Sequence, residues 1–317
     1  MKYNIDRLYE SVKTKGHVCV GLDTCIDYVP LSERNRVENN AQAVLSFNKA
    51  VIDATSDVAA CYKVQIAYYE EMGIEGLKAY RDTLKYIKSK DCLVIADIKR
   101  GDIADTALRY AKAHFSGDFE ADFVTLNPYM GMDSIQPWIN EASSHGKGAF
   151  VLMRTSNQGM KDFEYLEIKS AHESSRHFLY DAVGKKISAL SYQYKGNYGY
   201  GMFGVVVGCT PSEKDEALNI RINYPDLFFL IPGYGAQGGG PHDVALLLRD
   251  KNGGIVNASR SIINAWQNQD KREEEIKNAD NSSASLAARN SAVKMRDEIF
   301  QEINKNNDTQ RNTGDIK

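Results

Sequence analysis

The sequence predicts an α/β protein of the (β/α)8 (TIM) barrel class, with a single domain, an insertion between the fifth and sixth strands and a C-terminal helical extension. Three observations support this prediction: short apolar runs alternate with longer amphipathic stretches, the runs number eight, and polar side chains follow most of them. Alternating strands and helices favour parallel pairing. Eight such units in roughly 260 residues fit a closed barrel better than an open doubly wound sheet, which is the alternative.

The eight apolar runs are the predicted strands, because each is short and is followed by polar or glycine-containing sequence. They cover residues 18–23, 58–65, 92–99, 122–127, 149–155, 203–209, 227–232 and 254–259. Amphipathic stretches fill the gaps between the runs, as expected for helices that cover a barrel. The clearest of these predicted helices cover residues 41–55, 75–89, 106–115 and 134–144.

Two segments exceed a minimal barrel. Residues 157–200 connect the fifth strand to the sixth, with a helical pattern over 165–190 and then a turn rich in tyrosine and glycine. The polar C-terminal part contains an amphipathic helical pattern over 291–303 and then a segment too polar to pack. Its expected apolar positions are Val293, Met295, Ile299, Phe300 and Ile303. The predicted division of the chain is a barrel catalytic domain at 1–267, a helical extension at 268–305 and a disordered tail at 306–317.

The composition excludes two classes of partner. The chain has 317 residues, 43% of them hydrophobic and 26% charged, with a formal net charge of −3. This balance gives no general attraction to nucleic acid or to an anionic membrane. No apolar run approaches the length of a membrane span, and no secretory signal begins at Met1. The five cysteines form no C-x-x-C pair, so we expect a cytoplasmic protein with reduced thiols.

Polar residues at the C-terminal ends of the predicted strands mark the candidate site, because barrel active sites occupy that face. The strongest signal is the motif Asp97-x-Lys99-x-x-Asp102, which ends the third strand. Buried charges must be paired, so we expect these three side chains to form one network, completed by Lys63 from the neighbouring strand. The full set of polar strand ends is Asp23, Lys63, Asp97, Lys99, Asn127, Thr155, Ser156, Ser259 and Arg260.

This motif predicts acid chemistry on a carbanion. Two carboxylates keep the intervening lysine protonated, and a protonated lysine at a barrel mouth can donate a proton to a developing carbanion. A carboxylate fixed beside the lysine can repel a second carboxylate on a substrate. A structural ion pair is the alternative for the motif, and a side chain that extends into solvent is the alternative for Lys63.

Two later segments predict a phosphate site. The run GYGAQGGGP follows the seventh predicted strand, and SRS follows the eighth. Glycines let backbone N–H groups approach an anion, Gln237 can add an amide and Arg260 a charged fork. Barrels often bind phosphate at these two loops, although a flexible loop with a surface arginine is the alternative. The six histidines show no metal-ligand spacing, so we expect no metal.

Several of these motifs together resemble the orotidine 5′-phosphate decarboxylase family. They are VGLDT, YKVQ, DIKRGDI, GYGAQGGG and SRS, and the resemblance covers residues 18–265. It is nearest to the longer branch of that family, whose motif has the form D-I-K-R-G-D. The resemblance implies decarboxylation of orotidine 5′-monophosphate to uridine 5′-monophosphate, the last step of de novo pyrimidine synthesis, without a metal or an organic cofactor.

The resemblance also implies roles for individual residues. Lys99 would donate the proton to C6 of the pyrimidine, Asp97 would face the substrate carboxylate, and Lys63 with Asp102 would complete the network. Asp102 and Thr106 would reach into the site of a neighbouring subunit, which implies a homodimer with shared sites. The other implied contacts are Asp23 and Lys63 with ribose hydroxyls, Ser156 or Thr155 with the pyrimidine edge, and Gln237 and Arg260 with the phosphate.

Two other functions are alternatives. A related barrel decarboxylase or aldolase acting on a sugar phosphate shares D-x-K-x-x-D but, by resemblance, carries a Mg²⁺-binding glutamate where this chain has Lys63. A catalytically silent nucleotide-binding barrel is the second alternative, and it is disfavoured because unused buried charges are costly. The 157–200 insertion and the loop that contains Gln237 are the predicted closing elements over the site.

Overall fold

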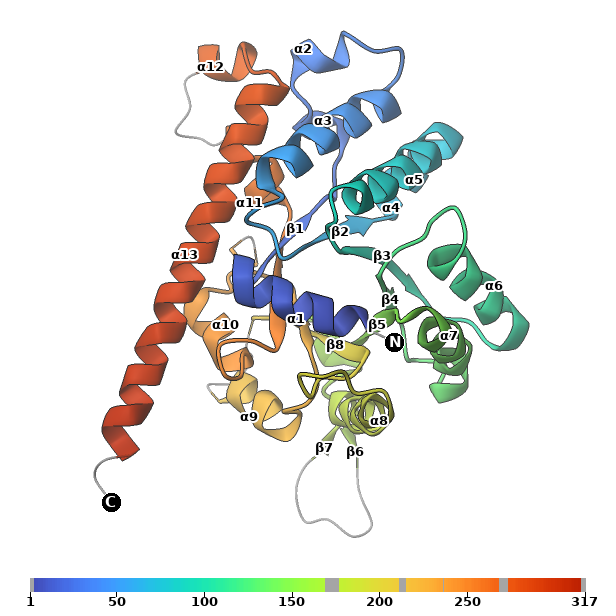
Figure 1. Ribbon diagram of the computed structural model, residues 1–317, viewed down its shortest axis with the longest axis vertical. Helices are drawn as coiled ribbons and strands as arrows, with labels where there is room; N and C mark the ends of the chain where they lie inside the picture. The colour runs from blue at the N-terminus through green and yellow to red at the C-terminus, as the bar shows by residue number, and fades with distance from the viewer. Residues whose placement is uncertain (1–2, 169–176, 211–214, 236, 268–272, 315–317) are drawn as a thin grey trace.

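Eight parallel strands close into a barrel in the computed structural model, which describes residues 3–168, 177–210, 215–235, 237–267 and 273–314 (Figure 1). Around the barrel the strands are β1 (Val18–Gly21), β2 (Cys61–Gln65), β3 (Val94–Arg100), β4 (Phe123–Leu126), β5 (Gly148–Arg154), β8 (Phe203–Val207), β9 (Phe229–Ile231) and β10 (Gly254–Ala258). Each coincides with one of the predicted runs, although β3 ends one residue later and β5 starts one residue earlier than predicted, and β10 pairs with β1 to close the ring. The predicted barrel class is therefore confirmed, and the open sheet is excluded.

Helices surround the barrel, and the four predicted ones are confirmed with slightly earlier starts. The α-helices are α1 (Asn4–Lys15), α2 (Leu31–Arg34), α3 (Asn40–Thr55), α4 (Ala67–Glu70), α5 (Gly73–Ser89), α6 (Ala104–Phe115), α7 (Met132–His145), α8 (Leu179–Gln193), α9 (Glu216–Asn223), α10 (Pro241–Leu247), α11 (Arg260–Ile263), α12 (Glu273–Lys277) and α13 (Asn281–Gly314). Three short 3-10 helices are η1 (Ile26–Tyr28), η2 (Gln158–Asp162) and η3 (Ala265–Gln267). In the part of the chain that is described, no helix is both long and apolar enough to cross a bilayer.

The apolar core has two layers, and β3 together with the residue before it, Leu93, contributes to both. Leu93 and Ile95 belong to the cluster inside the barrel, whereas Val94, Ala96 and Ile98 belong to the layer between strands and helices. This alternation is the one expected of a strand buried on both faces. The strand can therefore end in charged side chains that face the barrel mouth without weakening the outer layer.

The N-terminal end of the barrel is covered by α1. Its Ile5, Leu8 and Val12 pack into the inner cluster, and the Ser11 hydroxyl donates to the carbonyl of Ala60, just before β2. With this end closed by apolar side chains, the barrel interior is accessible only from the C-terminal ends of the strands. That end is where barrel enzymes carry their active sites.

The insertion after β5 differs from the single helical pattern predicted for 165–190. A two-stranded antiparallel sheet, β6 (Glu167–Ile168) with β7 (His177–Phe178), precedes α8, and residues 169–176 lie outside the described residues. The helix starts late because the ring of Phe178 packs against Tyr165 and Tyr180. The Phe178 N–H also donates to the carboxylate of Asp181 and so caps the helix start.

The tyrosine-rich turn after α8 lies at the closed end of the barrel. Tyr198 stacks on Tyr9 of α1 with ring centroids 4.1 Å apart, and the Asn197 amide donates to Asp6. This end is opposite the barrel mouth because α8 runs back along the strands. The prediction that the whole 157–200 insertion closes over the site is therefore wrong for its tyrosine-rich end, and among the described residues of the insertion it is Asn157 that lines the cavity.

The described part of the C-terminal extension consists of the short α12 and the long helix α13, which runs along the side of the barrel (Figure 1). It packs on α3, α10 and α11, with Ala284, Ala288 and Ala292 fully buried. It covers the side of the barrel where the four-residue α11 is too short to do so. The predicted helix over 291–303 lies within it, although Phe300 is 59% exposed, contrary to its predicted apolar position. The helix continues past 305 to Gly314, and residues 315–317 lie outside the described part.

Candidate active site

A cavity of about 510 Å³ opens at the C-terminal ends of the strands, where the sequence predicts the site. Strand ends from all around the barrel contribute to its lining, so one ligand can contact residues far apart in the chain. The predicted site residues in the lining are Asp23, Lys63, Asp97, Lys99, Thr155, Ser156, Gln237, Ser259 and Arg260. The geometry thus unites most of the predicted set in one concave space, as ligand sites require.

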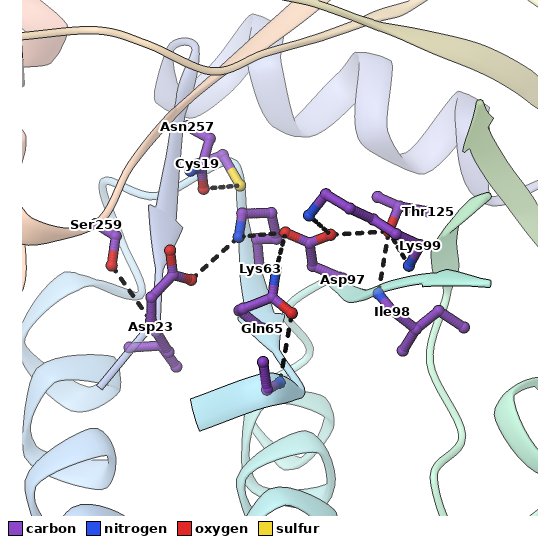
Figure 2. Close-up of polar contacts among 12 residues, drawn as sticks. Cys19, Asp23, Lys63, Gln65, Asp97, Ile98, Lys99, Thr125, Asn257 and Ser259 are labelled. Carbon is purple, nitrogen blue, oxygen red and sulfur yellow. Dashed lines mark hydrogen bonds and ion pairs between the residues drawn. The ribbon is translucent and has the colours of Figure 1, made fainter. Parts of the chain in front are cut away.

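Four charged side chains meet at one side of this cavity, and we call Asp23, Lys63, Asp97 and Lys99 the charged cluster (Figure 2). The Lys63 ammonium lies 2.8 Å from Asp97 Oδ2 and 3.1 Å from Asp23 Oδ1. The Lys99 ammonium lies 2.6 Å from the other oxygen, Asp97 Oδ1. Positive and negative groups alternate along this row, so the predicted pairing of Lys63, Asp97 and Lys99 is confirmed as geometry.

Asp97 is the centre of the cluster, because both of its oxygens accept two hydrogen bonds. Besides the two lysines, Gln65 Nε2 donates to Oδ2 at 3.0 Å and Thr125 Oγ1 donates to Oδ1 at 2.8 Å. Four donors occupy about the full lone-pair capacity of a carboxylate. The Asp97 carboxylate is therefore held in a single orientation.

Burial and charge act in opposite directions on the titration of these groups. Burial alone would raise the pKa of Asp97, but the positive charges of Lys63 and Lys99 outweigh it and lower that pKa well below its usual value. Burial alone would likewise lower the pKa of Lys63, but Asp23 and Asp97 raise it above the usual lysine value. Both groups therefore carry their charges at neutral pH, although each side chain is only 6% exposed.

Lys99 occupies a strained position at the end of β3. Its φ of 44° lies in the left-handed region, and the pairing of β3 with β4 shifts register between Ala96 and Arg100. A non-glycine residue in such a conformation costs roughly 1–3 kcal/mol. The Lys99 side chain remains 46% exposed at the cavity, so its ammonium touches both a buried carboxylate and the space open to a ligand.

Asp102 does not join the charged cluster within one chain, so the prediction of a single Asp97–Lys99–Asp102 network is wrong at this point. Among the described residues its carboxylate accepts only the N–H of Ile103, at 2.8 Å. β3 ends at Arg100, two residues before Asp102, and Asp102 is not part of the cavity lining. Thr106, on the following helix α6, is exposed and is likewise not part of the cavity lining.

Asn127, at the end of β4, also lies outside the cavity lining. Its side-chain oxygen accepts the N–H of Tyr129 at 3.0 Å. This is a local turn contact of the kind that asparagine commonly makes. Its place at a strand end is therefore explained by the turn that follows β4.

Thr155 and Ser156, which follow β5, differ in their availability. The Thr155 hydroxyl donates to Glu164 Oε1 at 2.7 Å, and its N–H donates to Glu164 Oε2 at 2.8 Å. These contacts attach the start of the insertion to the end of β5. In the described chain the Ser156 hydroxyl has no such partner, and Ser156 lines the cavity. Of the two, Ser156 is thus the better placed for a ligand.

The opposite side of the cavity is formed by the loops after β9 and β10. Gly233, Gly235 and Gly238 have φ values of 99°, 71° and 92°, which glycine adopts without strain. Gln237 and Arg260 are exposed at this side, and within the described residues the Arg260 guanidinium has no hydrogen bond or ion pair. Residue 236 of this loop lies outside the described residues. The arrangement provides an unpaired positive charge and a glycine-rich backbone, which suit a phosphate.

Gln65 and Thr125 were missed as site residues by the sequence analysis. Each sits inside an apolar run and carries a common polar side chain, so neither stands out alone. Strand alternation is the signal that could have found them, since Gln65 is two positions from Lys63 and Thr125 is two positions from the inward-facing Phe123. In the described residues, no cluster of three or more histidine, cysteine or acidic side chains could hold a metal ion.

Comparison with known sequences agrees with this geometry. Residues 16–274 match the model of the family described as orotidine 5′-phosphate decarboxylase / HUMPS. Curated orotidine 5′-phosphate decarboxylases are similar over nearly their full length. That of Clostridium kluyveri is 52% identical over 94% of this chain and 97% of its own. That of Clostridium tetani is 49% identical over 95% of this chain and 99% of its own.

Solved structures with the same architecture point to the same family. A putative orotidine 5′-phosphate decarboxylase from Streptomyces avermitilis superposes with a TM-score of 0.76 and 25% identity, over 96% of both chains. The UMP synthase of Leishmania donovani superposes with a TM-score of 0.70 and 30% identity, over 93% of this chain and 57% of that one.

Proposed function

We propose that the charged cluster performs the reaction of the family to which this chain belongs, the orotidine 5′-phosphate decarboxylase / HUMPS family. That reaction, which this chain catalyses, is the decarboxylation of orotidine 5′-monophosphate to uridine 5′-monophosphate. The enzyme is a carboxy-lyase of the last step of pyrimidine nucleotide synthesis. The observation that carries the proposal is the alternating row of charges, with Lys63 and Asp97 buried, beside a cavity of nucleotide-compatible size.

In the proposed reaction the bond between C6 of the pyrimidine and its carboxylate breaks, and CO2 leaves. The electron pair of that bond stays on C6 as a carbanion, which the Lys99 ammonium stabilises electrostatically. Lys99 then transfers a proton from Nζ to C6, and its partial exposure lets solvent restore that proton. Asp97, held charged by its four donors, faces the substrate carboxylate and disfavours the bound ground state relative to the transition state.

The remaining cavity residues bind the parts of the substrate that do not react. Asp23 and Lys63 contact ribose hydroxyls, and Ser156, rather than the locally bonded Thr155, contacts the pyrimidine edge. Gln237 and Arg260 bind the phosphate at the far side of the cavity. Binding energy from this remote phosphate can be used to orient the base against the charged cluster.

The reaction needs no metal or organic cofactor in this proposal, since preorganised charge replaces electron delocalisation. The test is a spectrophotometric assay for loss of orotidine 5′-monophosphate with and without EDTA. Equal rates support the proposal. Loss of activity on chelation favours the metal-dependent sugar-phosphate alternative, and no turnover under either condition favours a silent nucleotide-binding barrel.

We also propose a homodimer in which Asp102 and Thr106 act in the neighbouring subunit's site. Ile103, Tyr129 and Phe163 are 45%, 80% and 59% exposed, and they lie in the segments that follow the adjacent strands β3, β4 and β5. Such a group of exposed apolar side chains is typical of an interaction surface. The position of Asp102 outside the cavity lining leaves the site of one chain incomplete in comparison with the family, and a second copy supplies the missing carboxylate.

Mixing two inactive variants tests this arrangement. In a Lys99→Ala and Asp102→Asn heterodimer, one site has both defects and the other has neither, if Asp102 acts across the interface. After unfolding and refolding an equal mixture, about a quarter of the sites should be intact, because half of randomly assorted dimers are mixed. No recovery above the separate variants would mean that Asp102 acts within its own chain.

The cellular compartment is part of the same proposal. All five cysteines are free thiols, and Cys19, Cys61, Cys92 and Cys209 are buried. Buried thiols without disulfide partners suit a reducing cytoplasm. Immunodetection in fractionated cells of the source organism is the direct check, and recovery in a secreted fraction would contradict it.

A further inference from the structure

The hydroxyl of Thr125 makes three contacts that join β4 to the charged cluster (Figure 2). It accepts the backbone N–H groups of Ile98 and Lys99 at 3.0 and 2.9 Å. It donates its own proton to Asp97 Oδ1 at 2.8 Å. The side chain is 1% exposed, so water does not compete for these bonds.

These contacts use the whole hydrogen-bonding capacity of a hydroxyl, which has two acceptor lone pairs and one donor. Because the two amides occupy the lone pairs, the proton can be given only to Asp97. The direction of this bond is therefore imposed by the backbone. Any displacement of the Lys99 backbone changes the position of the hydroxyl and, through it, the position of the Asp97 carboxylate.

The two amides need this partner because the strand pairing fails at this point. Pairing of β3 with β4 runs through Ile95 and Ala96 and resumes only at Arg100. The amides of Ile98 and Lys99 lie in the shifted segment, where Lys99 also has its positive φ. Buried N–H groups must find an acceptor, and the Thr125 side chain replaces the missing backbone carbonyls.

We propose that Thr125 is a positioning residue for the decarboxylation, holding the Lys99 backbone and the Asp97 carboxylate in one fixed relation. Its hydroxyl acts through these two residues, while they act on the substrate. This inference rests on the proposed function of Lys99 as the proton donor. It goes beyond that function because it attributes the relative placement of Lys99 and Asp97 to a side chain on a different strand, β4.

Replacing Thr125 tests the proposal, with Thr125→Val removing the hydroxyl at nearly constant volume and Thr125→Ser keeping it. A misplacement of about 1 Å can cost on the order of 100-fold in rate. We expect Thr125→Val to lower kcat by about that factor with KM changed less than about threefold, since the substrate-binding groups remain. Thr125→Ser should restore kcat to within about fivefold of the unchanged chain, because the hydroxyl bonds are retained.

The matched control is Thr83→Val, at another fully buried threonine that hydrogen-bonds Asn48 and lies outside the cavity lining. It should lose thermal stability without a change in kcat. If Thr125→Val does not fold, Thr125→Ala is measured instead, because the space it opens can hold a water for the two amides. A kcat within about threefold of the unchanged chain in whichever of these variants folds would overturn the proposal.

The same experiment separates this inference from the proposed function. If the unchanged chain fails to decarboxylate orotidine 5′-monophosphate, the proposed function fails. If the unchanged chain is active and Thr125→Val loses activity through KM alone, or Thr125→Ser is as poor as Thr125→Val, only the positioning role fails.

Discussion

The two sides of the cavity are built differently. The charged cluster stands at the ends of β1, β2 and β3, and Lys63 and Asp97 are almost fully buried. Gln237 lies instead on the loop after β9, and Arg260 is the first residue of α11. Both are exposed, and the Arg260 guanidinium has no polar partner in the described chain. The side formed by the charged cluster, which we call the reacting side, is therefore organised before substrate arrives, as electrostatic catalysis requires. The phosphate side gains its contacts on binding, and that binding energy can drive closure.

The largest loss of activity is expected from a substitution on the reacting side. Lys99→Ala removes both the proton donor and the charge that stabilises the carbanion, so we expect kcat to fall by about 10⁴-fold or more. Binding of uridine 5′-monophosphate, measured by calorimetry, should remain detectable because the phosphate side is intact. Lys85→Ala, at a surface lysine on α5, is the control and should keep full activity. Retained decarboxylation by Lys99→Ala would remove the basis for the proposed mechanism.

A smaller effect is expected at the phosphate side. Arg260→Ala loses a charge-assisted bond to phosphate, which lowers kcat/KM for orotidine 5′-monophosphate by about 10- to 100-fold. Its kcat/KM for orotidine, which lacks the phosphate, should be unchanged. Arg36→Ala, a surface arginine paired with Glu33, is the control. An equal loss on both substrates would show that Arg260 does not act on the phosphate.

The pH profile should also separate the two sides. The pKa of Asp97 is lowered, so its charge is lost only when the pH falls through that lowered value, and the pKa of Lys63 is raised, so its charge persists as the pH rises. Both charges are therefore constant between about pH 5 and 9, and kcat should be flat there. A phosphate monoester gains a proton near pH 6, so kcat/KM should fall by about three- to tenfold between about pH 7 and 5. A kcat that rises or falls between about pH 5 and 9 would contradict the expectation that both charges are constant there.

The smallest effect tests whether α13 supports the phosphate loop. Tyr234, in the loop after β9, donates a hydrogen bond from its hydroxyl to Glu298 Oε2 of α13 at 2.9 Å. Because Glu298 is 41% exposed, we expect Glu298→Ala or Tyr234→Phe to raise KM only about threefold, with kcat unchanged. Asp297→Ala, at the next residue of the same helix, is the control. An unchanged KM in both variants would assign α13 to packing alone.

Much of the fold could be predicted from the sequence because its signals are local. Each of the eight apolar runs coincides with a barrel strand to within a few residues, and the polar residues after most of them converge on one cavity. The start of α8 could not be predicted, since it depends on the packing of Phe178 against Tyr165 and Tyr180. The tyrosine-rich turn could not be placed either, because its position depends on the direction in which α8 runs along the barrel.

The sequence alone determined that charged and polar side chains stand at strand ends, because alternation along a strand and the change to polar residues after it need no knowledge of neighbours. Only the tertiary structure decided which of these atoms meet. Barrel closure brings Gln65 and Thr125 onto Asp97, whereas Asp102 accepts the N–H of Ile103 and stays outside the cavity lining. Hydrogen bonds between residues on different strands depend on register and on the local backbone conformation. Register and backbone conformation are set by the packing of the whole barrel, so they cannot be predicted from the residue at any single position of the chain.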